Sequence, residues 1–140
     1  MIKQLHFNSL LPADVVVAKK RNGIGRILNH YIVYVGNNTF IGNLKEGVKI
    51  ISNSELNELF TDYEPIRIRR FQDTSNERKQ ALNRAYSNLG KTYDLIYFNC
   101  EHFANLVQKG IKSSSQVFLA TLICIGLTYK LTNSFYGERN

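Results

Sequence analysis

A chain of 140 residues is long enough to bury one hydrophobic core and too short for two large domains. Hydrophobic residues at 44%, charged residues at 21% and only two prolines exclude a disordered, collagen-like or low-complexity protein. The net charge of +7 attracts polyanions, but no zinc-finger spacing, RNA-binding aromatic motif or long arginine run accompanies it. We therefore expect solvated basic faces and no nucleic-acid partner.

The N-terminal half has the pattern of a small antiparallel sheet. Residues 1–6 lack the uninterrupted apolar run of a signal peptide, which favours a cytoplasmic protein. Residues 14–19 predict a strand, Asn22-Gly23 predicts a turn, and residues 27–36 predict a second strand, so these segments should form a hairpin. Further short strands are predicted at 39–41, 48–51 and 66–69, the first of them after a turn at Asn37-Asn38.

Three helices are predicted with clear boundaries. Ser52-x-x-Glu55 and Thr74-x-x-Glu77 are capping boxes, the first opening a short helix that stops before a proline and the second a longer one. Asn99 can cap a third helix, in which Cys100, Phe103, Ala104 and Val107 share one face and Gly110 marks the end. Strands followed by helices predict an α+β fold in which a small antiparallel sheet packs against helices.

Cys100 is the candidate nucleophile. A cysteine in the first turn of a helix has its thiol pKa lowered, because unpaired backbone N–H groups and the helix dipole favour the thiolate. The candidate bases are the three histidines, His6, His30 and His102. His102 lies about 200° round the helix from Cys100, and nothing in the pattern fixes His6. His30 lies on a predicted strand that can hold its ring rigidly, so we choose His30 as the base.

Two segments around these residues resemble a known family. Residues 99–105, NCEHFAN, are similar to the NCEHF signature of the lecithin retinol acyltransferase family, and residues 30–36, HYIVYVG, are similar to its HWxIYVG segment. An isolated helical cysteine is usually a small buried hydrophobe, and a strand histidine is usually structural. The two segments together reverse that expectation for Cys100 and His30.

The resemblance implies a permuted papain-like domain that transfers acyl groups. A thiolate attacks a phospholipid ester, an acyl-cysteine thioester forms, and an amine, alcohol, lysophospholipid or water accepts the acyl group. The acceptor is not encoded in these motifs, so transferase and phospholipase A-type hydrolase both remain open. Two alternatives are a cysteine peptidase or amidase of the same fold, and a non-catalytic membrane-recruitment module. No metal or other cofactor is expected, since Cys100 and Cys124 form no CxxC pair or metal-ligand cluster.

One element departs from the family pattern. The family places a third polar residue, usually histidine, about a dozen positions after the catalytic histidine, and the counterpart here is Gly42. A two-residue turn at Asn37-Asn38 pairs Ile32 with Asn43 and puts Asn43 on the same face as His30. A three-residue loop places Gly42 there instead. We name Asn43 as the candidate that orients His30, because an asparagine carbonyl can hold an imidazole.

The C-terminal segment is strongly apolar. Residues 113–129 carry no charge, and residues 117–127 are almost wholly apolar. We expect residues 1–116 to form the catalytic domain and residues 117–140 a hydrophobic helix and tail. A helix over 117–131 should dock on the domain or on a membrane interface, because the uncharged stretch is shorter than the ~20 residues of a membrane span. Phospholipid and a peripheral membrane surface are therefore the expected partners, and the oligomeric state stays open.

Overall fold

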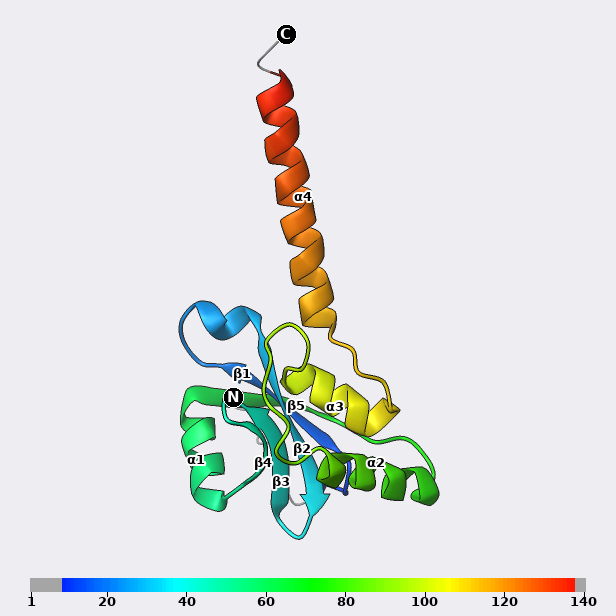
Figure 1. Cartoon of the computed structure of the whole chain (residues 1–140). Coiled ribbons are helices and arrows are strands. Elements are labelled where there is room, and N and C mark those ends of the chain that lie inside the picture. Colours follow the sequence, from blue (N-terminus) through cyan, green and yellow to red (C-terminus); the bar gives the residue numbers. More distant parts are fainter. Residues whose placement is uncertain (1–8, 138–140) are drawn as a thin grey trace.

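The centre of the protein is a five-stranded antiparallel sheet with the strand order β4-β3-β2-β1-β5 (Figure 1). A computed structural model describes residues 9–137 of the chain. His6, one of the candidate bases, lies outside these described residues. The strands are β1 Val15–Lys20, β2 Asn29–Gly36, β3 Thr39–Leu44, β4 Gly47–Ile51 and β5 Tyr63–Arg69.

The helices begin where the sequence placed their caps. Ser52, Thr74 and Asn99 each form the reciprocal side-chain and backbone bonds of a capping box. The α-helices are α1 Asn53–Asp62, α2 Ser75–Ser87, α3 Cys100–Lys109 and α4 Ser115–Gly137, and a short 3-10 helix, η2, spans Ile24–Ile27. The predicted α+β class is therefore confirmed.

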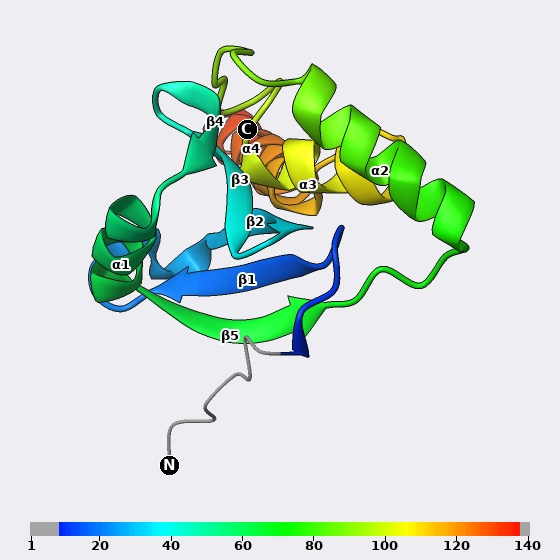
Figure 2. The same ribbon diagram turned by 90° about the horizontal axis from the view of Figure 1, so that it is seen from below.

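The two faces of the sheet bury different helices. Helices α2 and α3 cover one face, where Val17, Val33 and Ile41 pack against Phe103 and Val107 of α3 (Figure 2). Helix α1 covers the other face through Leu56, Leu59 and Phe60, which pack against a smaller cluster that contains Ile32. The alternation of side chains along β2 thus directs successive residues toward opposite helices.

Both predicted hairpins at β2 form, but each differs in detail from the expected one. The antiparallel pairing of β1 with β2 confirms the first hairpin, whose connection is an eight-residue loop, 21–28, that contains η2 and not a turn at Asn22-Gly23 alone. The turn after β2 does have two residues, with positive φ of 49° at Asn37 and 54° at Asn38. The register then shifts between Tyr34 and Gly36, which places Gly42 opposite Ile32.

The expected pairing of Ile32 with Asn43 is therefore wrong. A bulge in β2 adds one residue between the turn and the site, and one residue of slip exchanges the two faces of the partner strand. Sequence alternation counted from the turn alone does not include such a bulge.

Helix α4 projects from the domain instead of packing on it (Figure 1). Every residue from Phe118 to Phe135 is exposed, so of the two expected docking surfaces the domain is excluded and the membrane interface stays a prediction. The helix is also longer than the expected 117–131, since it continues past Lys130 and ends at Gly137. Among the described residues it is the one helix long and apolar enough to cross a membrane, over 115–135.

A backbone contact holds the segment before α3 against β4. The Val48 N–H donates to the Lys91 carbonyl at 2.8 Å, and the Gly90 N–H donates to the Val48 carbonyl at 2.8 Å. Gly47 has a φ of 106°, and a Cβ at this residue would collide with the Lys91 carbonyl oxygen. Glycine is needed here both for its backbone angle and for the close approach.

We expect Gly47→Ala to destabilise the protein more than Gly23→Ala. Both residues have positive φ, which costs alanine about 1–2 kcal/mol, but a Cβ at Gly23 meets nothing within 4 Å. The collision at Gly47 should add at least about 1 kcal/mol. Urea unfolding of the two variants, both kept in the same detergent because α4 is apolar and exposed, measures the difference in the free energy of unfolding. Equal losses would contradict the close approach of Gly47 to Lys91.

Candidate active site

The start of α3 is fixed by side chains on both sides of Cys100. The Asn99 Oδ1 accepts the backbone N–H groups of Glu101 at 3.0 Å and His102 at 3.1 Å, and its Nδ2 donates to the Leu95 carbonyl at 2.9 Å. The His102 Nδ1 accepts the Asn99 N–H at 3.3 Å. His102 is thus a capping residue, as its position round the helix predicted, and its ring is committed away from the thiol.

The Cys100 thiol is buried beside β2. Its Sγ lies 3.8 Å from the Asn29 carbonyl oxygen, and only 7% of the residue is exposed. Burial raises the pKa of the thiol from 9.0 to about 11, although the backbone N–H groups of Tyr31, Glu101 and Cys100 favour the thiolate. The expectation of a lowered pKa is therefore wrong, because loss of water outweighs the helix terminus.

His30 lies on β2 opposite Ala18 of β1, next to the thiol's neighbour Asn29. Its ring is tilted against Tyr63, with the centroids 5.4 Å apart. Burial lowers the pKa of His30 from 6.5 to about 4, and its Nε2 has no hydrogen-bond partner in the part of the chain described. The histidine and the thiol are therefore both uncharged at neutral pH.

Cys100 and His30 line one cavity of about 170 Å³, at the foot of α4. Its lining comes from six parts of the chain: Lys20, Leu28, Asn29, His30, Tyr63, Tyr93, Leu95, Asn99, Cys100 and Gln116. A second cavity of about 500 Å³ shares His30, Tyr63 and Tyr93 with the first and is otherwise lined mainly by charged residues around α1. Both side chains thus border the same partly closed space.

Two tyrosines that the sequence alone did not single out for the site lie near the thiol. The pKa values of Tyr63 and Tyr93 are raised by burial first and then by the negative charge that Cys100 can carry. Tyr63 begins β5, and Tyr93 lies in the loop before α3. Nothing in their local sequence marks them, because each reaches the cavity from a separate element.

Gly42 and Asn43 occupy different environments. A Cβ on Gly42 would lie 2.8 Å from the Ile51 Cδ1, so a larger side chain there requires Ile51 to move. Asn43 is fully buried, and its Nδ2 donates to the Phe98 carbonyl at 2.6 Å. This hydrogen bond connects β3 to the segment that leads into α3. Its Oδ1, like the His30 Nε2, is buried without a partner among the described residues. Asn43 and His30 both line the larger cavity.

Glu101 ties the helix of the cysteine to the start of α4. Its carboxylate is 4% exposed and accepts the hydroxyls of Ser114 and Ser115, both at 2.6 Å, and the Gln116 N–H at 3.1 Å. Burial raises the pKa of Glu101, but these hydrogen bonds outweigh it and the pKa is lowered overall. Glu101 is therefore held as an anion.

Gln116 completes the connection between α4 and the cavity. Its Oε1 accepts the Asn29 N–H at 2.7 Å, and its Nε2 donates to the Asn29 carbonyl at 3.3 Å. That carbonyl is the one beside the Cys100 Sγ. The first turn of α4 is thus linked to the thiol from both α3 and β2.

We expect the resting thiol of Cys100 to react slowly with iodoacetamide. A pKa near 11 instead of 9.0 leaves roughly 100-fold less thiolate at neutral pH. In the Cys124→Ser variant, where Cys100 is the only thiol, the alkylation rate should rise from pH 7 to 10 without a plateau. N-acetylcysteine is the reference. A plateau below pH 8 would show that an ion pair with His30 already activates the thiol.

We expect Glu101→Gln to destabilise the protein at pH 7 by about 1–3 kcal/mol, because it removes a charged hydrogen-bond acceptor. The folded-state pKa of Glu101 lies below its ordinary 4.5, so this stability is present above pH 4.5 and is lost as the pH falls through the folded value. Unfolding at pH 7 and at decreasing pH should show a smaller acid loss in the variant. Exposed Glu58 supplies the control, Glu58→Gln. Identical pH profiles in wild type and Glu101→Gln would contradict this role.

The sequence was also compared with known protein families, curated proteins and solved structures. The profile of the family described as lecithin retinol acyltransferase matches residues 9–113, which include β1 to β5 and all of α3. No curated protein and no solved structure gives a match. The matched range contains both the strand of His30 and the helix of Cys100, and it ends just before α4 begins. The chain belongs to the lecithin retinol acyltransferase family, whose members are thiol-dependent enzymes acting on lipid acyl groups.

Proposed function

We propose that this protein is an acyltransferase or phospholipase A-type hydrolase that forms a thioester on Cys100. The observation that carries the proposal is the cavity in which the thiol and His30, from two separate elements, lie together. Family membership supplies the class of chemistry. The residues proposed to act are Cys100 as nucleophile and His30 as base. Asn43 lines the larger cavity together with His30 and stays the candidate that orients it, although the register places Asn43 on the face of Ile41 and His30 on the face of Ile32.

The proposed reaction starts from a neutral Cys100 thiol and a neutral His30 imidazole. A His30 pKa of about 4 leaves the imidazole free to accept a proton throughout the neutral pH range. The thiol proton passes to the imidazole as sulfur attacks the ester carbonyl carbon. The carbon–oxygen bond then breaks, and the imidazolium returns the proton to the leaving glycerol oxygen. In the second half, water, an alcohol or an amine attacks the thioester while His30 takes its proton. The carbon–sulfur bond then breaks, and the imidazolium returns the proton to the Cys100 sulfur to release the thiol.

The backbone at the start of α3 is suited to stabilise the negative oxygen that develops. The Asn99 side chain occupies the N–H groups of Glu101 and His102, and the Cys100 N–H lies beside its own sulfur. A carbonyl attacked by that sulfur brings its oxygen close to the Cys100 N–H. We assign this N–H as the first donor of the oxyanion site.

The exposure of α4 supports membrane attachment through this helix. A 23-residue helix is about 34 Å long, close to the ~30 Å hydrocarbon thickness of a bilayer, and its large apolar side chains point into solvent. Lys130 lies about 20 Å along the axis from Val117, within reach of the far interface for a long side chain. We propose that residues 1–116 form the catalytic domain and that 117–140 anchor it to a membrane from the cytoplasmic side.

The test is intact-mass measurement after incubation with phosphatidylcholine vesicles. We expect a hydroxylamine-sensitive acyl adduct on the wild type and on the control variant Cys124→Ser, and none on Cys100→Ser. His30→Gln should form the adduct at least about 100-fold more slowly, the usual loss for a missing general base. An adduct that persists in Cys100→Ser would refute the assignment.

A non-catalytic membrane module is the second candidate. Three observations favour it: Gly42 stands where the family has a polar residue, the His30 Nε2 has no hydrogen-bond partner among the described residues, and the Cys100 pKa is raised. A properly folded wild-type protein that never acquires an acyl group from any phospholipid would establish this alternative.

A further inference from the structure

Three large apolar side chains are held in solvent beside the cavity. Leu95, Ile96 and Tyr97 form the tip of the 94–98 loop and are 60%, 56% and 70% exposed. The loop is ordered: the Asp94 and Phe98 backbones bond to each other at 3.1 and 2.9 Å, and the Asp94 carboxylate accepts the Ile96 and Tyr97 N–H groups at 2.9 and 2.7 Å. These hydrogen bonds thus hold the apolar tip in its exposed position.

A second apolar segment lies across the same cavity. Ile27 and Leu28, at the end of the 21–28 loop, are 81% and 43% exposed. Leu28 from this loop and Leu95 from the other line the cavity together with Cys100. The entrance to the thiol is therefore bordered on two sides by exposed aliphatic residues, which water-soluble proteins normally cover.

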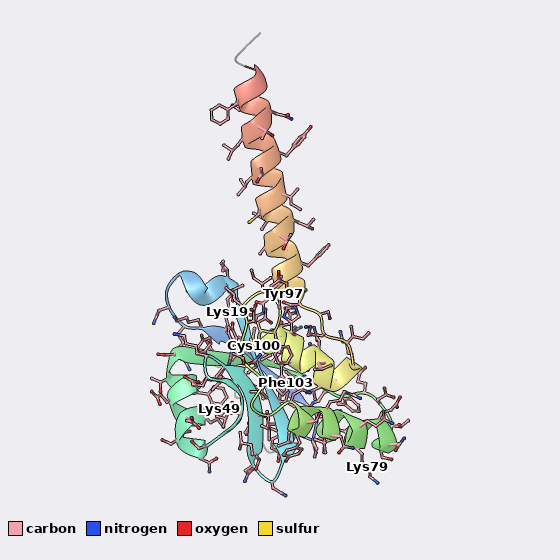
Figure 3. All side chains as sticks on the ribbon, viewed as in Figure 1. Lys19, Lys49, Lys79, Tyr97, Cys100 and Phe103 are labelled. Carbon is pink, nitrogen blue, oxygen red and sulfur yellow. The ribbon has the colours of Figure 1, made fainter. Side chains whose placement is uncertain are left out.

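Helix α4 leaves the domain at this same entrance. Gln116, in its first turn, lines the cavity and is bonded to Asn29. Figure 3 shows Tyr97 at the foot of α4 and Lys19 at the same end of the domain, with Cys100 below them in this view, further into the domain. A helix that enters a bilayer from this point brings the two loops to the bilayer surface.

We propose that Ile27, Leu28, Leu95, Ile96 and Tyr97 form a membrane-docking surface that seals the cavity mouth onto the lipid leaflet. The proposal rests on the membrane anchor proposed above and adds the orientation of the domain. Exposed Lys19 precedes the 21–28 loop and exposed Arg26 lies within it, and both suit the anionic headgroups at a membrane surface. Aromatic Tyr97 at the tip suits the interfacial region.

The size of the cavity agrees with this orientation. Pockets that enclose a drug-sized ligand have roughly 300–1,000 Å³, whereas the cavity at Cys100 has about 170 Å³. It can receive the ester and its immediate neighbours, and the acyl chains then extend past Leu28 and Leu95 into the bilayer. A substrate reaches the thiol without leaving the leaflet.

The chain contains no tryptophan, so a single introduced tryptophan is a unique fluorescent probe. I27W and I96W place it at the two loop tips, and Y86W, on exposed Tyr86 of α2, is the matched control. In full-length protein reconstituted into vesicles, the I27W and I96W emission should shift to shorter wavelength and be quenched by brominated phospholipid. The Y86W emission should do neither.

Emission of I27W and I96W that remains water-like and unquenched in vesicles would overturn the proposal. So would a blue shift that depends on protein concentration and not on lipid, because a second copy of the chain would then cover the surface. This measurement needs no turnover. An enzyme that forms no acyl adduct would refute the proposed activity, while the probes still decide the orientation.

A double substitution tests the consequence for substrate entry. Ile27→Asp with Ile96→Asp removes apolar docking area without altering a residue of the cavity lining. Adduct formation from vesicle phospholipid should fall by about tenfold or more, and adduct formation from a soluble short-chain ester should be unchanged. Equal rates from vesicles in the variant and wild type would contradict a docking role.

Discussion

Burial of the first turn of α3 is the constraint on which the rest of the site depends. Cys100, Glu101 and His102 all lie in the interior, at the end of a helix that has unpaired backbone N–H groups. Every polar group there needs a partner, because an unsatisfied buried group costs about 1–3 kcal/mol. Asn99 and His102 satisfy the backbone, and Ser114, Ser115 and Gln116 satisfy the Glu101 carboxylate.

The same burial determines the chemistry of the resting site. It raises the Cys100 pKa and lowers the His30 pKa, so both changes disfavour the thiolate–imidazolium pair. The proposed reaction accordingly moves the proton during the attack on the ester and not before it. A neutral, buried thiol is also less open to unspecific alkylation and oxidation.

The partners of Glu101 also give the site its position relative to α4. Since the carboxylate holds three consecutive residues at the start of that helix, the thiol and the apolar helix cannot move independently without breaking buried hydrogen bonds. The proposed membrane anchor would therefore hold the thiol at a fixed position relative to the bilayer. The apolar loops beside the cavity belong to the same proposed arrangement.

Local sequence determined most of the secondary structure and singled out Cys100 as the candidate nucleophile. Capping boxes, alternating strands and the residues around Cys100 depend on neighbours within a few positions, so they are visible without a fold. The bulge in β2 depends on how β2 pairs with β3, and it decided that Gly42 and not Asn43 lies opposite Ile32. The Cys100 pKa likewise followed burial by distant elements rather than the helix terminus. Three further residues line the cavity because three separate elements come together beside β2: Tyr63, Tyr93 and Gln116. No local sequence pattern contains such a relation between distant residues.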